Sequence, residues 1–301
     1  MERIRIPNLA TYLPIAPSDM LLAAPIAARV LFGASPAGRA LQVGAMGVYA
    51  GSAAIDWAVR INAKRVDFDA SFGIDPLNPP EATGPERRAD AEDLVGILND
   101  RYYPMTIPRR ELAEEVDRHL TDFLAQLTGQ RLETSAQVRS YMLAQVIFPF
   151  ALGAADPLTG DVAIFKNTGV FEPHVIAHEF CHRKGYLKEV EAQVLAYLAL
   201  AGSGDPVLEQ AAYCERLDRQ LWLLAERDAE TYNQLLVDVG LREELRTGFE
   251  LRHPAEQTYA RLVTPLMKGA YDARMKLTGQ NGLSDYDEGF TNFLLAHERN
   301  G

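Results

Sequence analysis

The sequence predicts a mainly α-helical fold with a small β element (α+β). Three observations support this prediction. Apolar residues recur at helical spacing through most of the second half, one short β-branched run interrupts them, and an apolar segment rich in Ala and Gly precedes both. We therefore expect an N-terminal apolar helical hairpin over residues 1–67, a linker or long loop over 68–89, and a helical domain over 90–301.

The hairpin is predicted from two apolar stretches, Asp19 to Phe32 and Ala40 to Val59, which a short turn containing Pro and Gly connects. A membrane-spanning helix needs about 20 predominantly apolar residues. Arg29 interrupts the first stretch and Asp56 the second. Two interpretations stay open: a hairpin packed within a soluble protein, or one that contacts a membrane through residues 19–59.

The predicted linker is rich in residues that break helices. It holds four prolines and mixed charge. Two helices follow, at about 87–100 and 108–127. In the second, apolar residues recur at helical spacing, at Leu112, Val116, Leu120, Phe123, Leu124 and Leu127.

A β-strand is predicted at Asp161–Lys166, a short β-branched run after a turn. It could accept an extended peptide along its edge, or it could belong to an ordinary small sheet that holds the next helix in place. The residues leave both roles open.

The next helix carries the sequence His178-Glu179-Phe180-Cys181-His182, which is an HExxH motif. Two histidines four residues apart lie on one helical face, so one Zn²⁺ can bind both rings. Glu179 projects beside that face, where a carboxylate can accept a proton from a metal-bound water. Pro173 suits the first turn of this helix and Gly185 its C-terminal cap, so the chain can fold back after His182.

The third metal ligand is predicted on the following helix. Glu189 and Glu191 lie two residues apart and so point to nearly opposite sides of a helix. Glu189 shares its face with small residues, Ala192 and Ala196, that permit close approach of the first helix. We therefore predict Glu189 as the ligand and Gln193 as a group that orients a ligand side chain.

These motifs carry a resemblance. An HExxH motif, a turn and then E-x-x-A resembles the gluzincin zinc metallopeptidases, in which a Glu on the next helix is the third ligand. A closer resemblance is to the uncharacterised bacterial family named domain of unknown function 3810, whose members look like membrane-associated zinc metallopeptidases. The segments that match are 159–167, 178–200 and the tail YDARMKLTGQNGLSDY over 271–286.

The resemblance also implies Tyr213 as a catalytic residue that stabilises the transition state, although its surroundings lack the family's Arg-Tyr-Ser pattern. Tyr259, Tyr271 and Tyr286 could donate a hydrogen bond to an oxyanion too, but aromatic residues at helical spacing are more often core residues. Two further departures, Gln193 in place of Asn and Cys181 in place of a small residue, leave the predicted ligands unchanged.

Composition excludes some functions. With 30 basic and 41 acidic residues the formal net charge is −11, which argues against nucleic acid as a partner. Two cysteines cannot build a disulfide framework, and the first 17 residues lack the apolar core of a signal peptide. We expect a cytoplasmic or membrane-associated protein.

The expected function is therefore that of a zinc-dependent hydrolase, a metallopeptidase in the first instance, with a peptide or a small molecule as substrate. Two alternatives stay open. One is a zinc enzyme that acts on a non-peptide small molecule, and the other is a non-catalytic zinc-binding sensor or scaffold. A strand edge exposed beside the metal would favour peptides, whereas a closed helical pocket would favour a small molecule.

Overall fold

The computed structural model describes the chain except for residues 9–31, 33–34, 141–150, 157–158, 254–257 and 301. The described part is mainly helical with two small sheets, as the sequence predicts. Its elements are β1 (Glu2–Arg5), α3 (Pro36–Asn62), α4 (Phe68–Phe72), α5 (Gly84–Asp100), α6 (Arg109–Thr128), β2 (Gln130–Glu133), β3 (Arg139–Ser140), β4 (Gly153–Ala155), β5 (Val162–Ile164), η1 (Gly169–Phe171), α8 (Glu172–Arg183), α9 (Glu189–Ala201), α10 (Pro206–Leu224), α11 (Ala229–Asp238), α12 (Glu243–Arg252), α13 (Thr258–Leu277), η2 (Leu283–Tyr286) and α14 (Glu288–Asn300).

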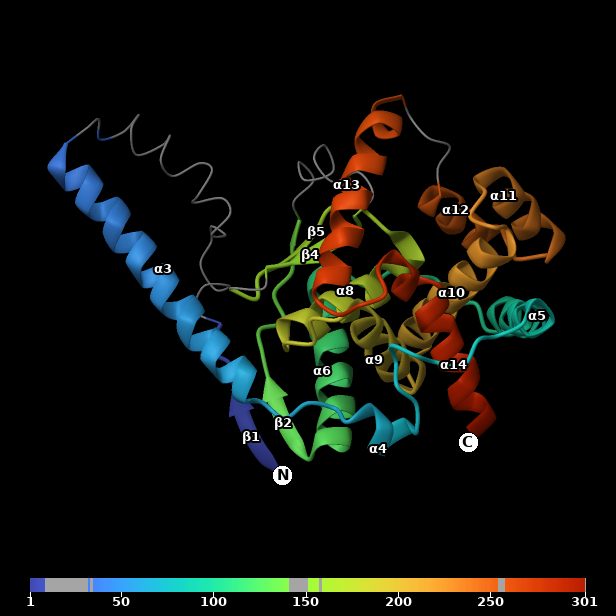
Figure 1. Cartoon of the computed structure of the whole chain (residues 1–301), viewed down its shortest axis with the longest axis horizontal. Coiled ribbons are helices and arrows are strands. Elements are labelled where there is room, and N and C mark those ends of the chain that lie inside the picture. Colours follow the sequence, from blue (N-terminus) through green and yellow to red (C-terminus); the bar gives the residue numbers. More distant parts are fainter. Residues whose placement is uncertain (9–31, 33–34, 141–150, 157–158, 254–257, 301) are drawn as a thin grey trace.

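Helices α8 and α9 form a hairpin at the centre of the molecule (Figure 1). Helices α6, α10 and α14 pack around this hairpin. The main apolar core lies between these helices and includes Ile176, Phe180, Leu195 and Phe293, all fully buried. Because both helices of the hairpin are surrounded, polar side chains on their facing surfaces are held away from bulk water.

The turn between α8 and α9 is a Schellman cap. The Tyr186 amide donates to the Cys181 carbonyl at 2.9 Å, and the Gly185 amide donates to the His182 carbonyl at 2.8 Å. Gly185 has φ +96°, and a Cβ there would lie 2.5 Å from Nη2 of Arg65. The left-handed backbone conformation therefore favours glycine, and a larger residue would also have to displace the Arg65 guanidinium.

The predicted strand at 161–166 is confirmed as β5, but β5 is the central strand of its sheet. The order is β3-β5-β4, with β3 parallel and β4 antiparallel to β5. Both edges of β5 are therefore paired, so β5 itself cannot accept another strand. In the described part of the chain, β4 has a neighbouring strand on one side only, and it packs on α8.

The N-terminal region is described only in part. The second stretch of the predicted hairpin is α3, a helix of 27 residues that projects away from the body in Figure 1. The first stretch, Asp19 to Phe32, lies outside the described residues except for Phe32. None of the described helices is long and apolar enough to cross a membrane.

Residues 68–89, predicted as a linker or long loop, pack onto the body in the structure. Phe68 and Ile74 are buried in the main core, and α4 begins at Phe68. Helix α5 begins at Gly84 rather than near Arg87, because Thr83 and Glu86 form a capping box. The proline content signalled a break in helical structure, but it did not signal that the segment packs on the core.

Candidate metal centre

The structure brings His178, His182 and Glu189 together between α8 and α9. Nε2 of His178 lies 3.1 Å from Nε2 of His182, and Oε2 of Glu189 lies 3.1 Å and 3.2 Å from these two atoms. In the described residues no other group of three His, Cys, Asp or Glu side chains converges in this way. Ligand atoms bound at about 2.0–2.1 Å to one tetrahedral zinc ion stand roughly 3.3 Å apart. The spacing and the donor set therefore both fit zinc.

The tautomer of His182 supports the same interpretation. Its Nδ1 lies 2.6 Å from the carbonyl oxygen of Tyr186. A carbonyl only accepts hydrogen bonds, so Nδ1 carries a proton, and Nε2 is the nitrogen that faces the cluster and would present its lone pair to a metal ion. Tyr186 owes its position to the Schellman cap. The turn that reverses the chain therefore also orients the second histidine.

Nε2 of His178, Nε2 of His182 and Oε2 of Glu189 all carry lone pairs, so their close approach requires a proton or a metal ion between them. Without a metal ion, a proton fills this role. Burial lowers the pKa of His182, but the Glu189 carboxylate outweighs this effect and raises the pKa to about 9. Burial also opposes ionisation of Glu189, yet the two histidines hold the pKa of its carboxyl well below the usual range. Zn²⁺ in the same position would satisfy all three atoms.

Glu191, the alternative ligand, is not part of the cluster. Its Oε1 forms an ion pair with Nζ of Lys188 at 3.1 Å. Glu189 is 5% exposed and begins α9, where its backbone amide donates to Oε1 of Gln280. The facing argument made from the sequence therefore agrees with the observed geometry.

Two polar side chains, those of Gln193 and His174, lie one helical turn from residues of the cluster. Gln193 is buried one turn after Glu189, but its Oε1 has no hydrogen-bond partner, and neither has Nδ1 of His178. His174 lies one turn before His178, and its Nδ1 is 3.7 Å from Glu215. Burial lowers the pKa of His174 to about 4, so this ring is neutral. Its nitrogens are not among the three ligand atoms that converge.

Glu179 lies between the cluster and β4. The Ala155 amide donates to its carboxylate, and a Cβ on Gly153 would lie 3.3 Å from Oε1 of Glu179. Its other oxygen, Oε2, is buried and has no hydrogen-bond partner. Burial raises the pKa of Glu179, while positive charge on the histidines opposes the rise. A carboxylate with a raised pKa and one free oxygen is suited to accept a proton.

Two tyrosines that the sequence reasoning assigned to the core reach the cluster. The Tyr271 hydroxyl on α13 donates to Oε1 of Glu189 at 2.6 Å, and the Tyr286 hydroxyl on η2 lies 3.2 Å from that of Tyr271. The Tyr286 ring is also 6.1 Å from the His178 ring. Burial and the Glu189 charge raise the pKa of both hydroxyls, which keeps them protonated as donors.

A family model described as a protein of unknown function, DUF3810, matches residues 55–295. The chain belongs to the DUF3810 family. No curated protein and no solved structure gives a significant match to it. The DUF3810 match includes α8, α9, α13 and η2, and so it spans every residue of the cluster and both tyrosines. Tyr271 and Tyr286 stand at the two ends of the tail segment whose resemblance to DUF3810 is visible in the sequence, and that was the signal that could have identified them.

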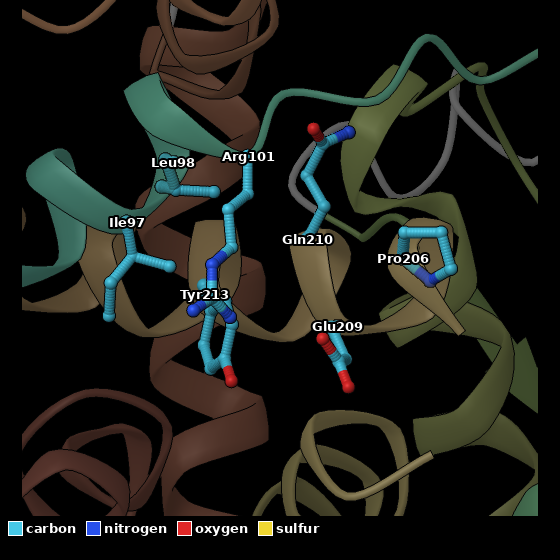
Figure 2. A pocket seen from close by; sticks show the side chains of 7 residues that line it. All are labelled: Ile97, Leu98, Arg101, Pro206, Glu209, Gln210 and Tyr213. Carbon is cyan, nitrogen blue, oxygen red and sulfur yellow. The ribbon is translucent and has the colours of Figure 1, made fainter. Parts of the chain in front are cut away.

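Tyr213 is not brought to the cluster. It lies on α10 beside Arg101 at the end of α5, and it lines a pocket with Ile97, Leu98, Arg101, Pro206, Glu209 and Gln210 (Figure 2). The pocket has a volume of about 50 Å³, far below the roughly 300–1,000 Å³ of sites that hold small-molecule ligands. No contact described in the structure joins Tyr213 to His178, His182 or Glu189.

Proposed function

We propose that this chain is a zinc-dependent hydrolase of the metallopeptidase type. The observation that carries the proposal is the convergence of Nε2 of His178, Nε2 of His182 and Oε2 of Glu189, all within 3.2 Å of one another, with the Glu179 carboxylate beside them. Two histidines and a glutamate leave a fourth tetrahedral position open, which is the mark of a catalytic rather than a structural zinc site. We include in this proposal the resemblance of the chain to the gluzincin metallopeptidases.

Each side chain has a distinct role in the proposed reaction. A zinc ion held there would supply a bound water with a pKa of about 7 and would polarise a carbonyl group. Glu179 takes the water proton on its free oxygen and later gives it to the leaving amine. Tyr271 holds the Glu189 carboxylate in place, and we assign to the Tyr286 hydroxyl, which lies beside that of Tyr271, the role of oxyanion donor first expected of Tyr213.

Among the described residues β4 has no strand neighbour on its second edge, which supports a peptide over a closed-pocket substrate. At the two ends of β5, the Leu152 carbonyl accepts from the Phe165 amide and the Asp156 amide donates to the Asp161 carbonyl. Because hydrogen bonds alternate along an antiparallel strand, the backbone groups of Gly153 and Ala155 point the other way, toward Glu179. The Ala155 amide already donates to Glu179, which leaves the Gly153 groups and the Ala155 carbonyl for an extended peptide.

Metal content and peptide cleavage together test the proposal. The purified protein, prepared without chelator, should contain about one zinc per chain, and His182→Ala should lose it. Glu179→Gln should keep the zinc but lose cleavage of a mixed peptide library by at least about 100-fold, because the amide cannot accept a proton. A wild-type protein without zinc would refute the metal assignment, and full turnover by Glu179→Gln would refute the role of the base.

A protein that binds zinc but cleaves no peptide would favour the two alternatives. A zinc enzyme acting on a small molecule would then still depend on Glu179, whereas a non-catalytic sensor or scaffold would not. Screening ester and amide metabolite analogues with the wild type beside Glu179→Gln separates these cases.

A further inference from the structure

Helix α9, which begins with the candidate ligand Glu189, is capped by a residue from a distant part of the chain. The first amides of a helix have no hydrogen-bond acceptor within the helix. Lys188 precedes α9, and its side chain forms no capping hydrogen bond. The Glu189 amide instead donates to Oε1 of Gln280 at 2.8 Å. Gln280 therefore supplies the acceptor that a lysine side chain lacks.

The side-chain amide of Gln280 is held in the orientation that this contact requires. Its Nε2 donates to Oγ1 of Thr278 at 3.1 Å, and that hydroxyl donates to the Met275 carbonyl at 2.8 Å. The backbone amide of Gln280 donates to the same carbonyl at 3.1 Å. Because Nε2 is directed to Thr278, Oε1 is the atom that faces α9.

A second contact from the tail segment, residues 271–286, reaches the carboxylate of Glu189. The Tyr271 hydroxyl donates to Oε1 at 2.6 Å, while Oε2 faces the two histidines. The segment is also bonded within itself, since the Leu283 amide donates to Oδ1 of Asp272 at 2.8 Å. The tail segment therefore holds Glu189 at two points, its backbone amide and its carboxylate.

These two contacts matter because α13 is otherwise attached along a narrow edge. Of the described elements, η2 is the one that α13 packs against most closely. Over residues 268–277, solvent reaches every side chain fully except those of Tyr271, Asp272 and Met275. Since little apolar area is buried along this edge, the polar contacts at Glu189 contribute much of the attachment.

We propose that Gln280 is a positioning residue of the metal centre, and that it acts with Tyr271 to couple zinc binding to docking of the tail segment. The inference rests on the zinc site of the proposed function. The docked segment fixes Glu189 where Oε2 meets the histidines, so the docked form binds zinc more tightly. Such coupling is reciprocal, so bound zinc in turn favours the docked form.

Chelator competition on full-length variants tests the positioning role. Gln280→Met keeps the length of the side chain but removes the acceptor, and it should weaken zinc binding about tenfold. Gln234→Met, at an exposed glutamine on α11, is the matched control and should bind zinc like the wild type. Cobalt(II) in the same site reports the ligand arrangement through its visible absorption. At saturating cobalt, Gln280→Met should alter the spectrum and Gln234→Met should not.

The double variant tests whether the two contacts act together. If both act through docking, either substitution alone releases the segment and the second adds little. Gln280→Met combined with Tyr271→Phe should then bind zinc within about threefold of either single variant. Independent contacts would give the product of the two losses, about 100-fold, and that result would overturn the coupling.

Hydrogen exchange on the wild type requires no substitution. Zinc should slow exchange of the amides in residues 271–286 at least about fivefold and leave those of α11 unchanged. Unchanged exchange in the tail segment at full zinc occupancy would refute the coupling alone, and zinc affinity of Gln280→Met equal to that of the wild type would refute the positioning role. Metal analysis keeps the two proposals apart, because a wild type that binds no zinc would refute the metal centre and the coupling together.

Discussion

At the residue scale, one backbone carbonyl decides which nitrogen of His182 faces the cluster. The Tyr186 carbonyl accepts from Nδ1, and Tyr186 is held by the cap that Gly185 makes possible. A substitution at Gly185 would therefore disturb the candidate metal centre without changing any of its three predicted ligands. It would strain a backbone with φ +96° and would collide with the Arg65 side chain.

The choice between the two glutamates gives the sharpest residue-level prediction. Glu189→Ala should weaken zinc binding by more than about 100-fold, because loss of groups that merely orient a ligand already costs about 10–100-fold. Glu191→Ala removes only an ion pair with Lys188 and should change zinc affinity by a few-fold at most. Competition with a chromophoric chelator measures both. A larger loss in Glu191→Ala would contradict the assignment.

A second residue-level prediction concerns the tyrosines. Tyr271→Phe removes the hydrogen bond to Oε1 of Glu189 and should weaken zinc binding by about tenfold. Tyr213→Phe is the matched control, since that hydroxyl has no described contact with the cluster, and it should bind zinc like the wild type. The same chelator competition reports on both variants, and equal behaviour of the two would refute the positioning role of Tyr271.

The sequence predicts the part of the candidate site whose residues lie close together along the chain. His178, His182 and Glu189 lie within twelve residues of one another, so the periodicity of two short helices and the turn at Gly185 between them are enough to predict that these residues face each other. Tyr271 and Tyr286 come from segments more than 80 residues away, and no local pattern carries that information. Tyr213 was singled out only through resemblance, and the structure brings a different pair of hydroxyls to the cluster.

At the element scale, α8 is bound to α10 and α12 by buried charges. His174 of α8 lies beside Glu215 of α10, and Glu215 and Asp218 both pair with Arg252 of α12. His253 follows, bonded to Asp218 at 3.0 Å. Removing one partner of such a buried ion pair strongly destabilises the fold, because the remaining charge is left buried and unpaired.

The neutral state of His174 makes stability depend on pH. Its folded pKa of about 4 lies below the ordinary value of 6.5. Unfolding therefore takes up a proton between these two values, and the stabilisation that is complete above pH 6.5 is lost as the pH falls toward 4. From pH 7.5 to pH 5 this ring should lower the free energy of unfolding by about 2 kcal/mol.

Urea unfolding at the two pH values measures this effect. The wild type should lose about 2 kcal/mol more than His174→Gln over the same interval, whatever the absolute stability of the variant. Metal-free protein is used for both, so that ligand protonation contributes equally. An identical loss in the two proteins would show that His174 is not held neutral in the fold.

Secondary structure was predictable to the extent that it is local. The spacing of Leu112, Val116 and Leu120 predicted α6, and β-branched residues predicted β5. A turn signal in the sequence separates β4 from β5, but the central position of β5 was not predictable, because β3 pairs with β5 from a segment further back along the chain. The packing of residues 68–89 was likewise decided by distant partners. Arg87, for example, bonds Thr291 and Asn292 of α14.

At the scale of the whole molecule, α3 is the part that the body does not cover. Its exposed large apolar residues are Leu41, Val43, Met46, Val48, Ile55, Trp57 and Ile61. Surface patches of this kind usually mark a partner surface. The membrane contact expected through residues 19–59 remains a proposal that this exposure supports.

Vesicle flotation tests that proposal. The wild type should float with vesicles, and Val43→Asp with Val48→Asp should weaken binding by at least about tenfold, because both side chains are exposed and a buried charge in lipid is costly. Leu251→Asp, at a similarly exposed apolar residue on α12, is the control and should bind like the wild type. A wild-type protein that stays with the dense fraction would contradict membrane contact.

Arg65 connects this helix to the turn beside the candidate metal centre. Its Nη2 donates to the carbonyl of Arg60 near the end of α3, its Nη1 donates to the carbonyl of Lys184, and its guanidinium lies 5.2 Å from the centre of the Tyr186 ring. One side chain thus ties the base of α3 to the turn that orients His182. The position of the candidate metal centre is therefore linked to that of α3. If the proposed hydrolase binds a membrane through α3, only substrate bonds at a set distance from that membrane would come within reach of the site.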